Sequence, residues 1–363
     1  MSTESIGAAG TEHPTLTEAI RVPIPGLDDS ARRIAVLGAG SWGTTFAKVL
    51  ADGGSDVMLW ARRREVAHEI TESHRNSDYL PGINLPRTLR AHDSLEKVLE
   101  GAEQVYLSVP SQTLRSNLHS IRDIVPADVP VVSLMKGVER GTGLRMSEVI
   151  HTELGIELAR IAVVSGPNLA LEIAKREPTA AVVSSVDPAT AREVAAAASN
   201  DYFKSFVNSD VIGTEFGGVL KNLIAVAVGI ADGVGYGENT KASIITRGLV
   251  ELTHFAVAFG AKPETMSGLA GLGDLIATCE SPLSRNNTAG RLLGQGYAFT
   301  EVIAQMNQTA EGLASVGPIL ELAAQQGVAM PIVSQVAQVL DGTLDPRELA
   351  PHLATDSDEP QGE

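Results

Sequence analysis

The chain has a single cysteine, Cys279, so it can form neither an internal disulfide bond nor a metal site made of cysteines alone. Basic residues are scarce as well, because 28 Lys and Arg stand against 44 Asp and Glu, a formal net charge of −16. A general nucleic-acid-binding protein needs an excess of positive charge to contact phosphates, and this composition argues against one. An anionic substrate would therefore need a locally basic site.

Two kinds of segment are also missing. Residues 1–31 contain no apolar core flanked by basic residues, so we expect no secretory signal. No charge-free apolar run reaches the roughly 18 residues of a membrane span, so none is predicted. The eight histidines are scattered, and His254, in a predicted helix, is expected to be a packed core residue rather than a ligand, so no metal site is predicted. These absences favour a cytoplasmic protein.

With 44% hydrophobic and 20% charged residues the chain is typical of a soluble globular protein, and its 363 residues are too many for one ordinary core. We expect two domains between polar tails. The expected segments are a flexible N-terminal tail at 1–31, an α/β domain at 32–208, an all-α domain at 209–353, and an acidic C-terminal tail at 354–363.

The first domain alternates apolar strand patterns with helix patterns. Strands are expected at 33–38, 56–60, 104–109, 129–135, 160–166, 179–185 and 202–207, and helices at 42–52, 111–120, 145–154 and 188–199. Nearly all-apolar strands that alternate with helices predict a Rossmann-like, doubly wound parallel sheet. After Asp210 only helical patterns remain, with breaks expected at 233–237, 260–263, 294–296, Gly312, Gly327 and Gly342.

A glycine motif opens the α/β domain. In "IAVLGAGSWGTTFAKVLADGG", Gly38, Gly40 and Gly43 form the pattern G-x-G-x-x-G directly after an apolar strand and at the start of a helix. In that context the glycines allow a tight turn, a close approach of a pyrophosphate, and close packing of helix on strand. Free N–H groups at the helix start can bind the phosphates. The motif predicts a dinucleotide site.

The end of the second strand bears on which dinucleotide binds there. A fold that prefers NAD usually carries Asp or Glu about 20 residues past the first glycine. This sequence has Arg62, Arg63 and Arg64 instead. Arginine can bind a 2′-phosphate in bidentate fashion, so NADP(H) is favoured and NAD(H) stays open.

Polar residues in unusual places point to a catalytic site. Lys221 and Asn222 lie inside the apolar helix pattern "GVLKNLIAVAVGIADG", and a lysine there is costly unless it is paired or has a lowered pKa. Lys136 ends a strand, at the edge of the sheet where ligands bind. Asp274 precedes an apolar helix turn, where a helix cap is the ordinary explanation.

Together these groups fit hydride transfer to a ketone. The developing alkoxide needs a proton or a cation nearby, and Lys221 can supply either, while Asp274 can hold the lysine in place. Ser284, Arg285 and Asn286 stand at a predicted helix start and can bind a phosphate group of the substrate. The sequence alone leaves open whether these residues converge.

A series of motifs resembles one family. The chain resembles the bacterial NAD(P)-dependent glycerol-3-phosphate dehydrogenases, and the similarity runs in order across residues 33–345. The matching motifs are "GAGSWGT" (38–44), "LPGINLP" (80–86), "VPSQTLR" (109–115), "MKGVE" (135–139), "SGPNLALEI" (165–173), "EFGGVLKNLIAVAVGIADG" (215–233), "GLAGLGDLIATC" (268–279), "SRNNTAGRLLGQG" (284–296) and "AEG" (310–312).

The resemblance implies reversible reduction of dihydroxyacetone phosphate to sn-glycerol 3-phosphate for phospholipid biosynthesis, and by analogy a homodimer. It implies that Lys221 is the acid/base, with Asn222 beside it to orient the carbonyl. The implied substrate positions are Lys136, Gly166, Asn168, Lys221, Asp274, Ser284, Arg285 and Asn286. The implied cofactor positions are Ser41, Trp42, Arg62, Arg63, Lys136, Ala170, Arg285, Thr309 and Glu311.

Two positions depart from the family pattern. Asn168 stands where many members have Ser, and Thr309 stands where an aliphatic residue is common. Two other functions remain alternatives: a hydroxyacid or ketoacid reductase of the same architecture, and a dinucleotide sensor without catalytic activity. The first would not need the phosphate-binding "SRNN", and the second would be expected to have lost Lys221 or Asp274.

Overall fold

The computed structural model describes residues 31–306 and 311–349. Of Glu311 it describes the backbone alone. Apart from Ala31, the first predicted tail lies outside the described residues, as does the second. The strands are β1 (Arg33–Leu37), β2 (Asp56–Trp60), β3 (Leu89–His92), β4 (Gln104–Leu107), β5 (Val131–Ser133), β6 (Ile161–Ser165), β7 (Thr179–Ser184) and β8 (Phe203–Asn208).

The strands form one sheet in the order β3-β2-β1-β4-β5-β6-β7-β8. Every neighbouring pair is parallel except β6 and β7, which run antiparallel. The predicted doubly wound sheet is therefore confirmed, with one antiparallel pair that the pattern did not predict. The sequence pattern did not predict β3 either, because this edge strand is only four residues long and reads Leu-Arg-Ala-His without an apolar run.

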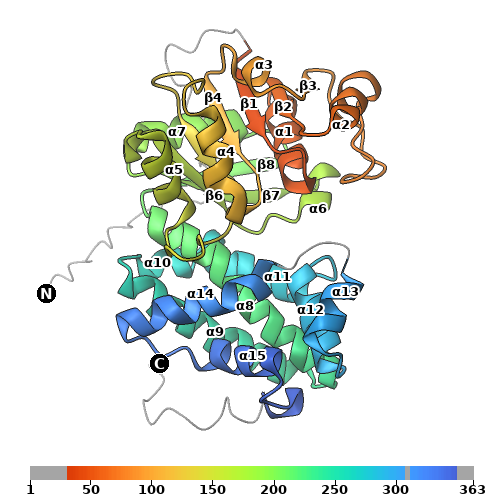
Figure 1. Ribbon diagram of the computed structural model, residues 1–363, viewed down its shortest axis with the longest axis vertical. Helices are drawn as coiled ribbons and strands as arrows, with labels where there is room; N and C mark the ends of the chain where they lie inside the picture. Colours follow the sequence, from red (N-terminus) through yellow and green to blue (C-terminus); the bar gives the residue numbers. More distant parts are fainter. Residues whose placement is uncertain (1–30, 307–310, 350–363) are drawn as a thin grey trace, which may run out of the picture. The chain divides into compact units, whose positions relative to one another are not determined.

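Helices cover both faces of the sheet (Figure 1). They are α1 (Ser41–Asp52), α2 (Arg64–His68), α3 (Leu95–Leu99), α4 (Leu114–Ile121), α5 (Met146–Leu154), α6 (Ala170–Ala174) and α7 (Pro188–Ala198). Alternate residues of β1 enter two separate cores: Ile34 and Val36 pack on one face, and Ala35 and Leu37 on the other. Burial on both faces explains why the central strands lack polar alternation.

The second half of the described chain is helical. Its helices are α8 (Val211–Val234), α9 (Glu238–Ala258), α10 (Pro263–Met266), α11 (Asp274–Glu280), α12 (Arg285–Gly294), α13 (Phe299–Gln305), α14 (Glu311–Gln326) and α15 (Pro331–Asp341). Most predicted breaks lie at helix ends. Gly312 also lies near one, in the first turn of α14, which begins at Glu311. A Cβ there would crowd the Asn222 carbonyl and the Asn286 side chain, so close packing explains the glycine.

Helix α8 is the core of this half and packs against α9, α11, α12, α14 and α15 (Figure 1). Among the described residues it is the one helix long and apolar enough to span a membrane, yet 89% of its apolar window is buried. That burial is expected of the central helix of a soluble protein. Asp210 caps its start by accepting a hydrogen bond from the N–H of Gly213 at 2.9 Å.

Two pairs of glycines bring α8 and α12 together. Gly229 and Gly233 on α8 face Gly290 and Gly294 on α12, and a Cβ at any of the four would overlap a backbone carbonyl of the opposite helix. The backbones therefore approach more closely than side chains would allow. This packing sets the distance between α8, which carries Lys221, and the start of α12.

Candidate active site

A cavity of about 820 Å³ lies at the carboxyl ends of β1, β2, β4 and β5. This edge of an open α/β sheet is where ligands usually bind. The helical half contributes Lys221, Asn222, Arg285 and Asn286 to the wall. Of the predicted site residues, the wall contains Gly38, Gly40, Ser41, Trp42, Gly43, Arg62, Arg63, Lys136, Asn168, Lys221, Asn222, Arg285 and Asn286.

The glycine-rich turn fits a dinucleotide. Gly38 has a φ of +121°, and a Cβ there would overlap the Ser108 carbonyl oxygen, so the tight turn requires glycine. A Cβ on Gly43 would overlap the Gly38 carbonyl oxygen. Gly40 has no atom within 4 Å of its Cβ position, which leaves room for a ligand next to the backbone. No side chain caps the start of α1, so its first N–H groups remain available for phosphates.

The arginines after β2 differ in their surroundings. Arg62 and Arg63 lie in the cavity wall, whereas Arg64 does not. The Arg63 guanidinium is paired with Asp78 and lies 3.8 Å from Glu65. Arg62 is exposed and has no ion pair among the described residues. Arg62 is therefore the arginine best placed to bind a 2′-phosphate.

Two lysines from different halves of the chain share one carboxylate. Lys221 donates to Asp274 Oδ1, and Lys136 donates to Asp274 Oδ2 at 2.5 Å and to the Gly166 carbonyl at 3.2 Å. Asp274 is 1% exposed and Lys221 is 8% exposed. Thr278 donates its hydroxyl hydrogen to the Asp274 carbonyl and accepts a bond from Lys221 Nζ at 2.7 Å. The Lys221 ammonium is thus fixed with its protons directed to known acceptors.

Burial changes the acidity of this lysine. Loss of hydration is the largest effect and lowers the pKa of Lys221 to about 8, although the negative charge of Asp274 acts in the opposite direction. The positive charge of Lys136 lowers it further. An amine with a pKa near 8 can both give and take a proton around neutral pH.

The start of α12 lies beside this cluster. Ser284 is its N-cap and accepts a hydrogen bond from the N–H of Asn287 at 3.2 Å. Asn286 accepts one from the N–H of Gly312 at 3.0 Å, which ties α12 to α14. Arg285 reaches the cavity wall. A helix start with an arginine beside it is suited to a phosphate group.

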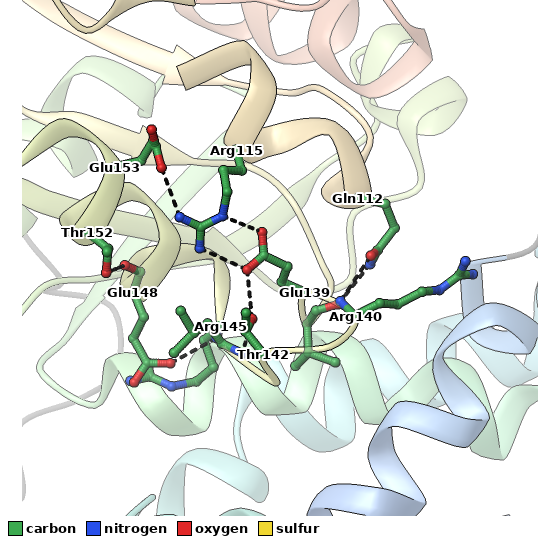
Figure 2. Close-up of polar contacts among 11 residues, drawn as sticks. Gln112, Arg115, Glu139, Arg140, Thr142, Arg145, Glu148, Thr152 and Glu153 are labelled. Carbon is green, nitrogen blue, oxygen red and sulfur yellow. Dashed lines mark hydrogen bonds and ion pairs between the residues drawn. The ribbon is translucent and has the colours of Figure 1, made fainter. Parts of the chain in front are cut away.

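The loop that follows Lys136 is hydrogen-bonded to the segment before α4 and to α4 itself (Figure 2). Gln112 donates to the Val138 carbonyl at 2.8 Å and accepts from the N–H of Arg140 at 3.1 Å. Arg115 binds both oxygens of Glu139 at 2.9 Å, and this guanidinium is the main reason that the pKa of Glu139 is lowered. Lys136 therefore extends from a backbone with little freedom to move.

The remaining predicted residues lie around the cavity or outside the described chain. Both amide atoms of Asn168 are buried and have no hydrogen-bond partner among the described residues, which suits a ligand-binding side chain. Gly166 contacts Lys136 through its carbonyl, and the Ala170 carbonyl accepts a bond from Thr45 at 3.2 Å. Thr309 lies outside the described residues, and of Glu311 only the backbone is described.

Comparison with known proteins agrees with this geometry. Residues 33–191 match the family profile of the NAD-dependent glycerol-3-phosphate dehydrogenase N-terminus, and residues 210–351 match that of the C-terminus. The chain belongs to this glycerol-3-phosphate dehydrogenase family. The family resemblance read from the motifs is therefore confirmed.

Three glycerol-3-phosphate dehydrogenases illustrate the relationship. The [NAD(P)+] enzyme of Leifsonia xyli subsp. xyli is 73% identical over 328 residues, which cover 90% of this chain and 89% of that protein. The [NAD(P)+] enzyme of Streptomyces griseus is 52% identical, over 91% of this chain and 98% of that protein. The solved structure of the Coxiella burnetii enzyme is 37% identical, with a TM-score of 0.84, over 90% of this chain and 99% of that chain.

Several residues of the site were not predicted from the sequence. Thr278 binds the catalytic lysine candidate, and its spacing of four residues from Asp274 on one helix was the available signal. Tyr79 also lines the cavity. A polar face of the α4 segment does so through Thr113, Ser116, Asn117 and Ser120. Nothing in the local sequence distinguishes Tyr79 or these four α4-segment residues from ordinary surface residues.

Proposed function

We propose that the protein is an sn-glycerol-3-phosphate dehydrogenase, which reversibly reduces dihydroxyacetone phosphate to sn-glycerol 3-phosphate with NAD(P)H. The observation that carries this proposal is the cluster of Lys221, Asp274 and Lys136 beside the cavity that contains the glycine-rich turn. Family membership and the names of the related enzymes support the choice of substrate.

The dinucleotide supplies the hydride when it is bound. Lys221 donates the proton that the ketone oxygen takes up, and it accepts that proton in the reverse reaction. Asp274 and Thr278 hold the ammonium group in position. Lys136 adds a second positive charge that stabilises the developing alkoxide. Asn222, the next residue on α8, orients the carbonyl.

The substrate phosphate binds at the start of α12. Ser284, Arg285 and Asn286 supply the contacts there, and Gly166 and Asn168 complete the substrate site on the side of the sheet. Gly38, Gly40, Gly43, Ser41 and Trp42 would hold the dinucleotide, and Arg62 and Arg63 would bind its ribose end. Ala170, Thr309 and Glu311 are assigned to the cofactor from the family pattern alone.

We infer further properties from the family and the fold. The division into domains at 32–208 and 209–353 is supported by the two family profiles, which cover 33–191 and 210–351. A cytoplasmic location, a supply of glycerol 3-phosphate to phospholipid biosynthesis and a homodimeric state rest on the resemblance to the family. The burial of α8 supports the expectation that the chain does not span a membrane.

The deciding experiment follows the loss of NADPH absorbance with purified protein. Dihydroxyacetone phosphate is compared with dihydroxyacetone and with a panel of ketoacids. Rapid oxidation of NADPH is expected with the phosphate ester alone, because the proposed contacts of Arg285 and the start of α12 are made to the phosphate group of the substrate. Oxidation with a ketoacid instead would overturn the substrate, and binding of NADPH without any oxidation would favour a sensor.

The acidity of Lys221 predicts the pH dependence. Because its pKa is lowered to about 8 and reduction requires the protonated form, kcat/KM for ketone reduction should fall tenfold per pH unit above about pH 8. Oxidation of glycerol 3-phosphate needs the neutral amine, so its kcat/KM should rise up to the same pH. Initial rates between pH 6 and 10 in both directions test this, and a reduction profile flat to pH 10 would refute it.

The arginine cluster predicts the cofactor preference. NADPH should be used more efficiently than NADH, and Arg62→Ser should lower kcat/KM for NADPH by roughly tenfold or more while NADH is little affected, because a charge-assisted contact to the 2′-phosphate is lost. Arg64→Ser is the matched control, since Arg64 lies outside the cavity wall. Equal losses of kcat/KM with both cofactors would show that Arg62 does not bind the 2′-phosphate.

A further inference from the structure

One buried side chain outside the cavity contacts the glycine-rich turn. Asn76 is 0% exposed and belongs to the 74–85 loop, which follows a short helical turn at Glu69–Ser73. Its amide nitrogen Nδ2 donates to the Ala39 carbonyl at 3.0 Å and to the Thr44 hydroxyl at 2.8 Å. Asn76 therefore connects this loop to both the turn and the first part of α1.

We propose that Asn76 is a positioning residue for the dinucleotide site, which holds the glycine-rich turn in the conformation that binds the pyrophosphate. This inference rests on the proposed use of a dinucleotide. Asn76 does not line the cavity, so its effect on the ligand is transmitted through Ala39 and Gly40, which do.

The planarity of the peptide bond explains how the contact acts. In a trans peptide the C=O of Ala39 and the N–H of Gly40 point in opposite directions. Asn76 binds that carbonyl from outside the cavity, so the Gly40 N–H is directed to the other side. Among the described residues nothing accepts a hydrogen bond from this N–H. It is thus a donor available to a phosphate oxygen next to the open space at Gly40.

The side-chain amide of Asn76 is specifically suited to the contact with the Ala39 carbonyl. A carbonyl oxygen can only accept, so Nδ2 must face Ala39, and Oδ1 then points elsewhere. Oδ1 is buried and has no hydrogen-bond partner among the described residues, a costly arrangement for a residue that only fills space. Leucine would fill a similar volume without that cost. The retained amide is explained by the bonds that Nδ2 makes.

The loop that presents Asn76 is itself fixed. The N–H of Leu80 donates to the Asn76 carbonyl at 2.8 Å, and the N–H of Leu85 donates to the His74 carbonyl at 2.9 Å. Glu69 accepts from both the N–H and the hydroxyl of Ser77. Asn76 therefore acts from a rigid support.

Dissociation constants of NADPH and NADH, measured by titration of protein fluorescence, test the proposal. Asn76→Asp is isosteric but cannot donate to Ala39 when ionised, and Asn76→Leu preserves volume without polar atoms. Both variants should weaken both dinucleotides by about tenfold and to the same extent, because the pyrophosphate is common to them. Asn200→Asp is the matched control, since the Asn200 amide nitrogen Nδ2 also donates to a backbone carbonyl of α1, that of Val49 at 3.0 Å, but at the end of the helix far from the turn, and its affinities should be unchanged.

Melting temperatures of the free proteins identify folded variants, so that a loss of affinity is not confused with unfolding. Folded Asn76 variants that bind both dinucleotides as tightly as the wild type would overturn the inference alone. A loss confined to NADPH would also overturn it, because the effect would then lie at the ribose end, through Asp78 and Arg63. A wild-type protein that binds neither dinucleotide would instead overturn the proposed function.

Discussion

Replacement of Lys221 by methionine should lower kcat for reduction of dihydroxyacetone phosphate by roughly two to four orders of magnitude, the usual contribution of a positioned acid/base group. Methionine has a similar length and suits the apolar wall of α8, so the fold should persist. Affinity for NADPH should change little, because the lysine lies at the substrate end of the cavity. Steady-state kinetics together with a dinucleotide titration separate the two effects.

Lys48→Met is the matched control for this variant. Lys48 is also buried and paired with a carboxylate, Asp52 at 2.6 Å, but it lies outside the cavity wall. The control should lose some stability and keep kcat near the wild-type value. Wild-type turnover in Lys221→Met, or an equal loss in both variants, would contradict the acid/base role.

Replacement of Gly290 by alanine should produce a large loss of stability. Its Cβ would overlap the Val226 carbonyl oxygen of α8, and no side chain can move aside to relieve a contact between two backbones. Overpacking of this kind should lower the free energy of unfolding by about 3 kcal/mol. It should also raise KM for the phosphate ester, because α12 carries Ser284, Arg285 and Asn286 at its start. Thermal melting and substrate titrations measure the two effects.

Gly317→Ala on α14 provides the comparison. Apart from its chain neighbours nothing lies within 4 Å of that Cβ position, and the higher helix propensity of alanine is offset by the ring of the following Pro318, so the free energy of unfolding should change by less than about 1 kcal/mol. If Gly290→Ala melted at the wild-type temperature, the close contact of α8 and α12 would not be what fixes the start of α12.

Much of the fold follows from local pattern. Strands buried on both faces are nearly continuous apolar runs, and seven of the eight strands were predicted, most of them from such runs; the edge strand β8 is mixed, with polar and exposed residues. The exception, β3, is short and has arginine and histidine among its four residues. The antiparallel direction of β7 relative to β6 could not be predicted from the sequence, because a strand buried on both faces has the same apolar pattern in either direction.

Part of the candidate site can likewise be recognised from the local sequence. The glycine motif, the arginines after β2 and the lysine inside α8 are recognisable because each conflicts with, or completes, the pattern of its immediate neighbours. Sequence pattern and family resemblance together therefore predicted the fold class, the candidate dinucleotide site and the catalytic lysine candidate.

Only the tertiary structure decided which groups meet. Asp274 lies 138 residues from Lys136 and 53 from Lys221, yet it binds both. The contact of Asn76 with Ala39, the role of Thr278 and the closeness of α8 and α12 likewise depend on how distant segments pack. Local periodicity depends on neighbours along the chain, whereas these contacts form only when the sheet and the helices have assembled around their common cores.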